Sequence, residues 1–277
     1  MAARLCAAGV APMVYNRSPG PADALRALGA SVADTSAQLF ASCDAIILML
    51  ADDAAVDAIL ARRESDFGAR AQGRLIINMG THSPEFSLAL SNDIVAAGGS
   101  FVEAPVSGSR GPAESGELVA MLAGKANAIA QARALLGSMC STTVVAGAVP
   151  TALAMKLAVN LYLIASVTAL AEAAHLARLS DVNLDQFAEV IGSGALGSAV
   201  ARAKLDKIRR DDFSPQAAIA DVVKNARLVE GLAAKVRAQA PLLKESRMRF
   251  ESVAAAGLGG LDMAAVYASY APGTVPE

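Results

Sequence analysis

The stretch AIILML at Ala45–Leu50 is an unbroken apolar run of strand length. A strand that is buried on both faces carries such a run, whereas a strand with one solvated face alternates apolar and polar residues. The pattern is typical of a parallel sheet that helices cover on both sides. It therefore predicts an α/β domain around Ala45–Leu50.

Short apolar runs alternate with helix-like segments on both sides of this stretch, as they do in a doubly wound α/β fold. We expect that fold in residues 1–147. Strands are predicted at Met13–Tyr15, Ala45–Leu50, Leu75–Met79, Phe101–Glu103, Val119–Leu122 and Thr143–Val145, and helices at Pro21–Leu28, Thr35–Ala41, Ala54–Ala61, Pro84–Ala97 and Ala126–Leu136.

No convincing strand pattern occurs beyond about Pro150. Pro150 stands just before the first helix expected there, a place that proline favours. We therefore expect an all-α domain in residues 148–277. Its predicted helices are Thr151–Leu179, Leu184–Ile191, Ser198–Arg209, Pro215–Ala238, Pro241–Ala256 and Met263–Tyr270.

Composition narrows the class of protein. The chain is 54% hydrophobic and 18% charged, with a formal net charge of -2, so a disordered chain and a nucleic-acid partner are not expected. The three cysteines, Cys6, Cys43 and Cys140, lack metal-ligand spacing and predict free thiols in the cytoplasm. Leu157–Leu170 is apolar but shorter than the ~18–20 residues of a bilayer span, so we expect a core helix and no membrane.

The first residues depart from the usual order of a doubly wound nucleotide-binding domain. Such a domain opens with a strand, a Gly-rich turn and a helix whose N-terminus holds a pyrophosphate. Here Met1–Gly9 has the pattern of the end of that helix, with Gly9 near its C-cap, and no G-x-G-x-x-G motif lies nearby. We therefore expect a Rossmann-like sheet from which the first strand is missing.

Asn16, Arg17 and Ser18 follow the first predicted strand. In dinucleotide domains an acidic residue here accepts from the ribose 2′-hydroxyl of NAD, whereas an Arg accommodates the 2′-phosphate of NADP. No acidic residue stands at this strand end, and Arg17 with Ser18 offers donors suited to phosphate. The same residues also suit an ordinary polar turn.

The segment Glu103–Gly111 follows another predicted strand and contains Ser107 and Gly108. Glycine removes the Cβ barrier to a ligand that approaches the backbone, and successive N–H groups with a serine hydroxyl can hold a carboxylate. A plain surface turn explains the composition equally well.

Lys156 stands on the long predicted helix, where its helical neighbours are Ala152, Leu153, Val159 and Asn160. A solvated lysine face carries other charges, and none appears here. Burial lowers the pKa of a lysine towards the range useful for proton transfer. Lys156 is thus a candidate general acid and base that Asn160 orients, and the alternative is a structural lysine that reaches solvent along its stem.

Together these segments resemble the β-hydroxyacid dehydrogenases, over essentially the whole chain. That family includes 3-hydroxyisobutyrate dehydrogenase, tartronate semialdehyde reductase and glyoxylate/succinic semialdehyde reductases, and it is related to 6-phosphogluconate dehydrogenase. The resemblance is carried by Val14–Ser18, Met49–Asp52, Asn78–Pro84, Ala104–Met121, Met155–Asn160, Asp221–Asn225 and Gly257–Asp262.

The resemblance implies hydride transfer between NADP, or alternatively NAD, and a small 3-hydroxy acid or related semialdehyde or 2-oxo acid. It makes Lys156 the proton donor and acceptor, with Asn160 beside it. It also implies a homodimer or homotetramer and no metal. The implied substrate contacts are Ser107, Gly108 and Ser109, and the implied cofactor contacts are Asn16, Arg17, Ser18, Leu50, Ala51, Thr81 and Lys224.

Three alternatives concern the departures from the family. An imine reductase shares the architecture but generally lacks this lysine. A non-catalytic oligomeric remnant would explain the missing Gly-rich turn, and so would a start codon placed downstream of the true one, which we favour because the other motifs are largely intact. On either ground we expect the chain as given to bind NADP weakly or not at all. Ser109 in place of a family Gly, and Val159 in place of an Asn, are expected to tune the substrate.

Overall fold

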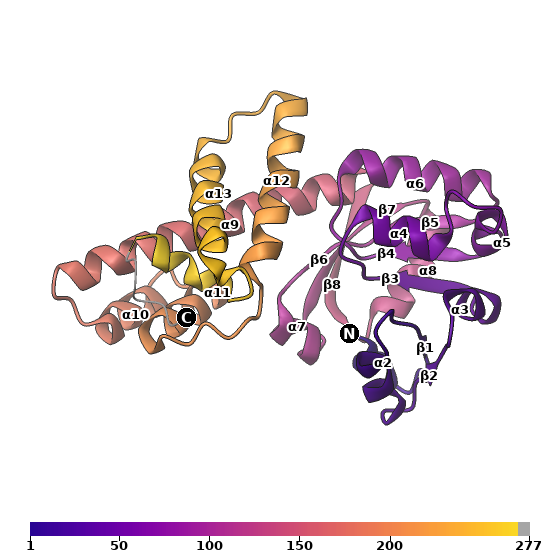
Figure 1. Cartoon of the computed structure of the whole chain (residues 1–277), viewed down its shortest axis with the longest axis horizontal. Coiled ribbons are helices and arrows are strands. Elements are labelled where there is room, and N and C mark those ends of the chain that lie inside the picture. The colour runs from indigo at the N-terminus through magenta and orange to yellow at the C-terminus, as the bar shows by residue number, and fades with distance from the viewer. Residues whose placement is uncertain (271–277) are drawn as a thin grey trace. The chain divides into compact units, whose positions relative to one another are not determined.

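The computed structural model describes residues 1–270, and the chain divides into two compact units, Met1–Lys156 and Leu157–Glu277 (Figure 1). Helix α9 (Thr151–Leu179) begins in the first unit and continues in the second. The division therefore falls inside a helix, and the boundary expected from the sequence, between residues 147 and 148, lies just before that helix begins.

The main sheet of the first unit contains six strands in mixed orientation. Strands β3 (Ala45–Leu48), β4 (Leu75–Asn78) and β5 (Ser100–Glu103) are parallel neighbours. Strand β7 (Leu118–Gly124) runs antiparallel to β5 and also pairs with β6 (Val106–Ser107), while β8 (Cys140–Gly147) lies parallel to β7. The parallel arrangement that the apolar runs favour is found in β3–β5, whereas β7 departs from it, because apolar runs report burial but not strand direction.

Two further strands stand apart from this sheet. β1 (Met13–Val14) and β2 (Ser31–Val32) pair in parallel as a separate two-stranded sheet. Among residues 1–270, β1 pairs only with β2, and β3 pairs only with β4. The edges of β1 and β3 away from these partners carry no strand in the part of the chain that the structure describes.

Helices cover both faces of the main sheet at β4 and β5, which confirms the doubly wound arrangement. Ile77 and Val102 on one face share a core with α8, and Ile76 and Phe101 on the other share a core with α4 and α6. The first unit's helices are α1 (Ala2–Ala7), α2 (Pro19–Arg26), α3 (Ser36–Ser42), α4 (Asp53–Leu60), α5 (Phe67–Ala71), α6 (Pro84–Ala96), α7 (Arg110–Ser115) and α8 (Ala126–Leu136).

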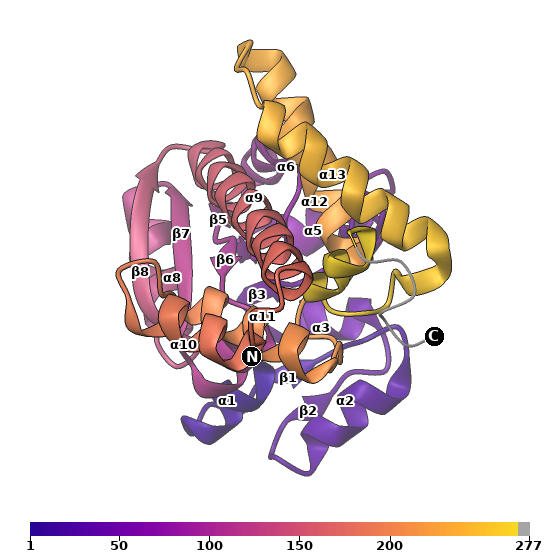
Figure 2. The same cartoon turned by 90° about the vertical axis from the view of Figure 1, so that its left-hand side faces the viewer.

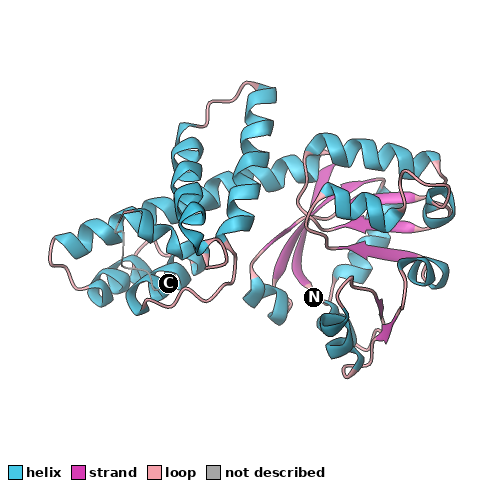
Figure 3. Ribbon diagram, in the orientation of Figure 1, coloured by secondary structure: helices cyan, strands magenta, loops and turns pink. Residues whose placement is uncertain are grey.

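The second unit is built of helices alone over its described residues, 157–270, as predicted (Figure 3). Helix α12 begins at Ile219 rather than at Pro215, and α12 and α13 lie side by side (Figure 2). Beyond α9 the unit contains α10 (Leu184–Ser193), α11 (Ala199–Arg210), α12 (Ile219–Val236), α13 (Pro241–Val253), a π-helical turn (Ala254–Leu258) and a 3₁₀ segment (Met263–Ser269).

Helix α9 is long and apolar enough to cross a membrane by length and composition. The core helix of a soluble protein has the same two properties. One face of α9, which includes Leu157, Ile164, Val167 and Ala171, is buried in the core of the second unit. That face packs as the core helix predicted from the sequence.

A buried carboxylate anchors the start of α9. Glu103 ends β5 with no exposed surface, and its Oε2 accepts hydrogen bonds from the backbone N–H of Ala152 at 3.1 Å and of Leu153 at 3.3 Å. The first N–H groups of a helix lack partners within the helix, so the carboxylate satisfies two of them. Burial raises the pKa of Glu103 above its ordinary value, although these backbone bonds act in the opposite direction.

A buried ion pair holds the second unit together. Lys204 of α11 lies 2.8 Å from Oδ1 and 2.9 Å from Oδ2 of Asp262. The carboxylate also accepts from the N–H groups of Gln216, Ala217 and Ala264. Burial acts to raise the pKa of Asp262, but the bonds from Lys204 and the backbone outweigh it, and the pKa falls below its ordinary value.

We predict that Asp262→Ala lowers the free energy of unfolding of the helical unit by about 3–5 kcal/mol, because it leaves Lys204 buried without a counter-charge. Urea unfolding followed by circular dichroism measures the loss. Asp206→Ala is the matched control: Asp206 pairs with Arg209 at a solvated position, where a pair is worth about 1 kcal/mol or less. Equal losses in the two variants would show that the buried pair contributes no more than a surface pair.

We predict a pH-dependent effect of Glu103→Gln. Folding raises the pKa of Glu103, so the protonated carboxyl stabilises the folded state relative to the unfolded state. This contribution to the free energy of unfolding is complete below the unfolded-state pKa and is lost as pH rises through the folded-state pKa. Gln cannot ionise, so its stability relative to wild type should improve as pH rises from about 4, near the ordinary glutamate pKa, to neutrality. Urea unfolding at several pH values checks this, and parallel curves for both proteins contradict it.

Candidate functional site

Lys156 lies in the second turn of α9, and burial leaves it 9% exposed. Desolvation by this burial lowers the pKa of Lys156 to about 8. Within residues 1–270 its amine has no hydrogen-bond or ion-pair partner. Asn160, one turn further along α9, is 3% exposed, and its Nδ2 likewise has no partner among the described residues. Two buried polar groups on one helix face are thus available to a ligand.

The turn around Gly108 is fixed by packing. Gly108 has φ +124°, and a Cβ there would lie 2.7 Å from Leu118 Cδ2 and 3.0 Å from Pro112 Cβ, so only glycine fits. Ser107, half-buried, ends β6, and Ser109, also half-buried, is the N-cap of α7 without a side-chain capping bond. The turn therefore leaves both hydroxyl groups and the backbone between them for another partner.

Arg17 is exposed between β1 and α2. Asn16 donates from Nδ2 to the Ser18 carbonyl at 2.7 Å, which shapes this turn, and Ser18 is the N-cap of α2 without a side-chain capping bond. Among the described residues Arg17 has no ion-pair partner. An exposed guanidinium beside a helix N-terminus suits a phosphate group.

Leu50, Ala51 and Thr81 follow the parallel neighbours β3 and β4, whose carboxyl ends meet at one edge of the sheet. Leu50 and Thr81 are half-buried and Ala51 is exposed. The structure thus brings these three predicted cofactor contacts to one sheet edge, the edge at which doubly wound folds bind ligands. Lys224, half-buried on α12, is the one predicted cofactor contact in the second unit.

Two residues near the candidate site were not predicted from the sequence. Glu103 was predicted only as the end of a strand and the start of a loop, and its capping role needs a partner about 50 positions along the chain. His82 was quoted only within a motif, yet its side chain is fully buried and its Nδ1 lies 2.6 Å from Oδ1 of Asp53. A histidine directly before the N-cap residue Ser83 was the one local signal.

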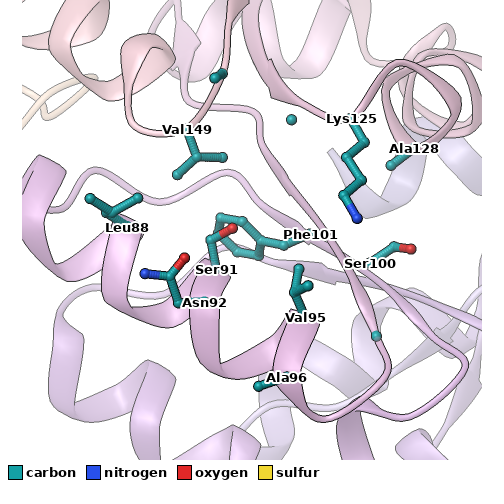
Figure 4. A pocket seen from close by; sticks show the side chains of 13 residues that line it. Leu88, Ser91, Asn92, Val95, Ala96, Ser100, Phe101, Lys125, Ala128 and Val149 are labelled. Atoms are coloured by element: carbon teal, nitrogen blue, oxygen red, sulfur yellow. The ribbon is translucent and has the colours of Figure 1, made fainter.

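A pocket of about 490 Å³ lies elsewhere in the first unit, beside α6, β5 and the start of α8 (Figure 4). Leu88, Val95, Phe101 and Val149 give it apolar walls, and Lys125 is a cationic group that lines it. None of the predicted site residues lines this pocket. No cluster of His, Cys, Asp or Glu able to hold a metal ion occurs among residues 1–270.

Comparison with known proteins covers both units. Residues 1–147 match the family described as the NAD binding domain of 6-phosphogluconate dehydrogenase, and residues 151–270 match NAD-binding of NADP-dependent 3-hydroxyisobutyrate dehydrogenase. Glyoxylate/succinic semialdehyde reductase 1 of Arabidopsis thaliana is 28% identical over 96% of this chain and 92% of its own length. YfjR of Bacillus subtilis (strain 168), described as an uncharacterized oxidoreductase, is 31% identical over 94% of this chain and 91% of its own length.

Comparison with solved structures indicates the same family. The crystal structure of 3-hydroxyisobutyrate dehydrogenase from Salmonella typhimurium superposes with a TM-score of 0.86 at 26% identity, over 96% of this chain and 94% of that one. The family resemblance and the fold class predicted from the sequence are confirmed. The chain belongs to the 3-hydroxyisobutyrate dehydrogenase family, the NAD(P)-dependent oxidoreductases of the β-hydroxyacid dehydrogenase type.

Proposed function

We propose that the chain transfers a hydride reversibly between NADP(H) and a small 3-hydroxy acid or the related semialdehyde or 2-oxo acid, with Lys156 as general acid and base. The observation that carries this proposal is the state of Lys156. It is buried on an apolar helix face, its pKa is lowered to about 8, and it has no partner within residues 1–270. A structural lysine would be expected to have a carboxylate or a carbonyl beside it.

The two protonation states of Lys156 serve the two directions of the reaction. In reduction its ammonium donates a proton to the carbonyl oxygen; in oxidation its neutral amine accepts the hydroxyl proton. A pKa near 8 keeps both forms populated around neutral pH, which is what general acid–base catalysis requires. The bound nicotinamide supplies or accepts the hydride. Asn160, one turn along α9, orients the substrate oxygen or the amine.

A carboxylate-bearing substrate suits the turn at Ser107, Gly108 and Ser109. The glycine-dependent backbone and the two flanking hydroxyl groups offer donors to an anion. The printed name of the Arabidopsis thaliana relative supports the same class, since glyoxylate and succinic semialdehyde are small carbonyl compounds that carry a carboxylate.

NADP is the cofactor that Arg17 favours. The exposed guanidinium, with Asn16 and Ser18 beside it, would hold the 2′-phosphate, while Leu50, Ala51, Thr81 and Lys224 would contact the rest of the dinucleotide. In support, no acidic residue occupies the 15–18 turn, where an acid would select NAD. The family matched by residues 151–270 is likewise described by an NADP-dependent enzyme.

We also propose a homodimer or homotetramer. The support is exposed apolar surface on α9, where Tyr162 is 75% exposed, Leu176 67% and Leu179 71%. Large apolar side chains left exposed on one helix are suited to an interface between subunits.

We predict that Lys156→Ala lowers kcat at least ~100-fold, the lower range for a positioned acid or base, while the circular dichroism spectrum and the Kd for NADPH stay close to wild type. Steady-state reduction of glyoxylate and of succinic semialdehyde measures the loss. Lys125→Ala, at an exposed lysine of the same unit, is the control. A loss of less than about tenfold would make Lys156 a structural residue.

The pH dependence checks the same assignment independently. Reduction needs the protonated amine, so kcat for reduction should fall as pH rises through about 8; oxidation needs the neutral amine, so its kcat should rise through the same value. Stopped assays in both directions between pH 6 and 10, ~0.5 unit apart, record the two limbs. The proposed role is contradicted if kcat changes in the same direction with pH for both reactions. It is also contradicted if Lys156→Arg keeps the wild-type pH dependence.

We predict that Arg17→Ala weakens NADPH binding about tenfold or more and leaves NADH binding within about twofold, because a charge-assisted bond to the 2′-phosphate is lost. Calorimetric titration of both cofactors measures this. Arg26→Ala, which removes an exposed arginine at the other end of α2, should change neither. An equal loss of affinity for both cofactors would show that Arg17 does not bind the 2′-phosphate.

A further inference from the structure

One hydrogen bond joins the turn after β4 to the helix that follows β3. His82 lies just before Ser83, the N-cap of α6, and its side chain has no exposed surface. Its Nδ1 lies 2.6 Å from Oδ1 of Asp53, the first residue of α4. The Asp53 side chain is 51% exposed, so the ring is buried while its partner reaches solvent. The bond therefore ties the two turns that carry Leu50, Ala51 and Thr81.

The imidazole occupies space that another side chain would need. A Cβ on Gly80 would lie 2.5 Å from Nε2 of His82 and 3.0 Å from the Leu50 carbonyl oxygen. The φ of Gly80 is not in the left-handed region, so its glycine is required by space rather than by backbone conformation. Asn78 fixes the position further, because its Oδ1 accepts from the Gly80 N–H at 3.1 Å. Gly80 is thus held between the β3 turn and the His82 ring.

The polar atoms of the ring have different surroundings. Nδ1 faces the Asp53 carboxylate and carries the hydrogen in that bond, which makes Nε2 an acceptor in the neutral ring. Nε2 is buried and has no partner within the described 270 residues. A second contact is the Phe86 ring, with centroids 5.2 Å apart. The ring therefore fits this position through one directed bond and through its shape.

We propose that Gly80 and His82 are a matched pair and that His82 is a positioning residue: through Asp53, and in the space that Gly80 leaves, it sets how the turns at Leu50–Ala51 and Thr81 meet the dinucleotide. The proposal rests on the proposed function for the identity of that ligand. It assigns His82 to cofactor affinity and not to proton transfer, which belongs to Lys156.

The first test separates positioning from stability. His82→Ala should raise the KM for NADPH about tenfold and change kcat less than about threefold, because misplacement of a binding group by a fraction of an ångström weakens binding without removing the proton donor. His82→Asn should recover most of the affinity, since its Nδ2 can replace the Nδ1 donor to Asp53. His175→Ala, which removes the only other histidine, should leave both constants unchanged.

The second test is a double-mutant cycle of melting temperature and KM. Gly80→Ser alone should lower the melting temperature and raise the KM, whereas the same change in His82→Ala should cost much less, because the clashing ring is gone. Additive effects, or a His82→Ala protein that melts earlier but keeps its KM, overturn the proposal. A wild-type chain that reduces neither glyoxylate nor succinic semialdehyde at saturating NADPH refutes the proposed function instead, and the melting-temperature cycle, which needs no cofactor, still decides the Gly80–His82 pairing.

Discussion

The carboxylate of Glu103 at the first turn of α9 is the contact on which the position of Lys156 depends. It joins the end of the buried strand β5 to the N–H groups of Ala152 and Leu153. Lys156 follows one turn later on the same rigid helix, and a helix rises about 1.5 Å per residue, so fixing its first turn fixes the lysine as well. Helices cover both faces of the sheet at β5, and Glu103 has no exposed surface, so this carboxylate is kept away from solvent.

Two buried lysines differ in the partners that surround their amines. Lys204 and Lys156 are both buried, and desolvation lowers the pKa of each. Lys204, however, lies against both oxygens of the Asp262 carboxylate, which also receives three backbone N–H groups, so its charge is neutralised locally. Lys156 has no such partner in residues 1–270. The difference in partners, not in burial, marks Lys156 as the chemically available group.

Sequence patterns predicted more of the fold than of the candidate site. The bounds of α9 and the apolar face around Lys156 could be predicted, since helical neighbours are three or four positions apart. The short elements β2, β6, α5 and α7 were missed because two to six residues show no periodicity, and the direction of β7 depends on connections that composition does not reveal. The His82–Asp53 contact joins residues 29 positions apart, and the Glu103 bonds reach further still. The folded sheet brings such distant residues together, so a local sequence pattern does not reveal these contacts.

Because Arg17 is exposed, the strength of its interaction with a phosphate depends on ionic strength. A guanidinium in solvent acts on a phosphate through water, where the screening length is about 8 Å at physiological salt and about 3 Å at 1 M. The buried amine of Lys156 is largely shielded from mobile ions. Salt concentration therefore affects binding at Arg17 more than protonation of Lys156. Under the roles proposed for Arg17 and Lys156, discrimination between a phosphorylated and an unphosphorylated dinucleotide weakens in concentrated salt, while the proton-transfer equilibrium at α9 stays nearly the same.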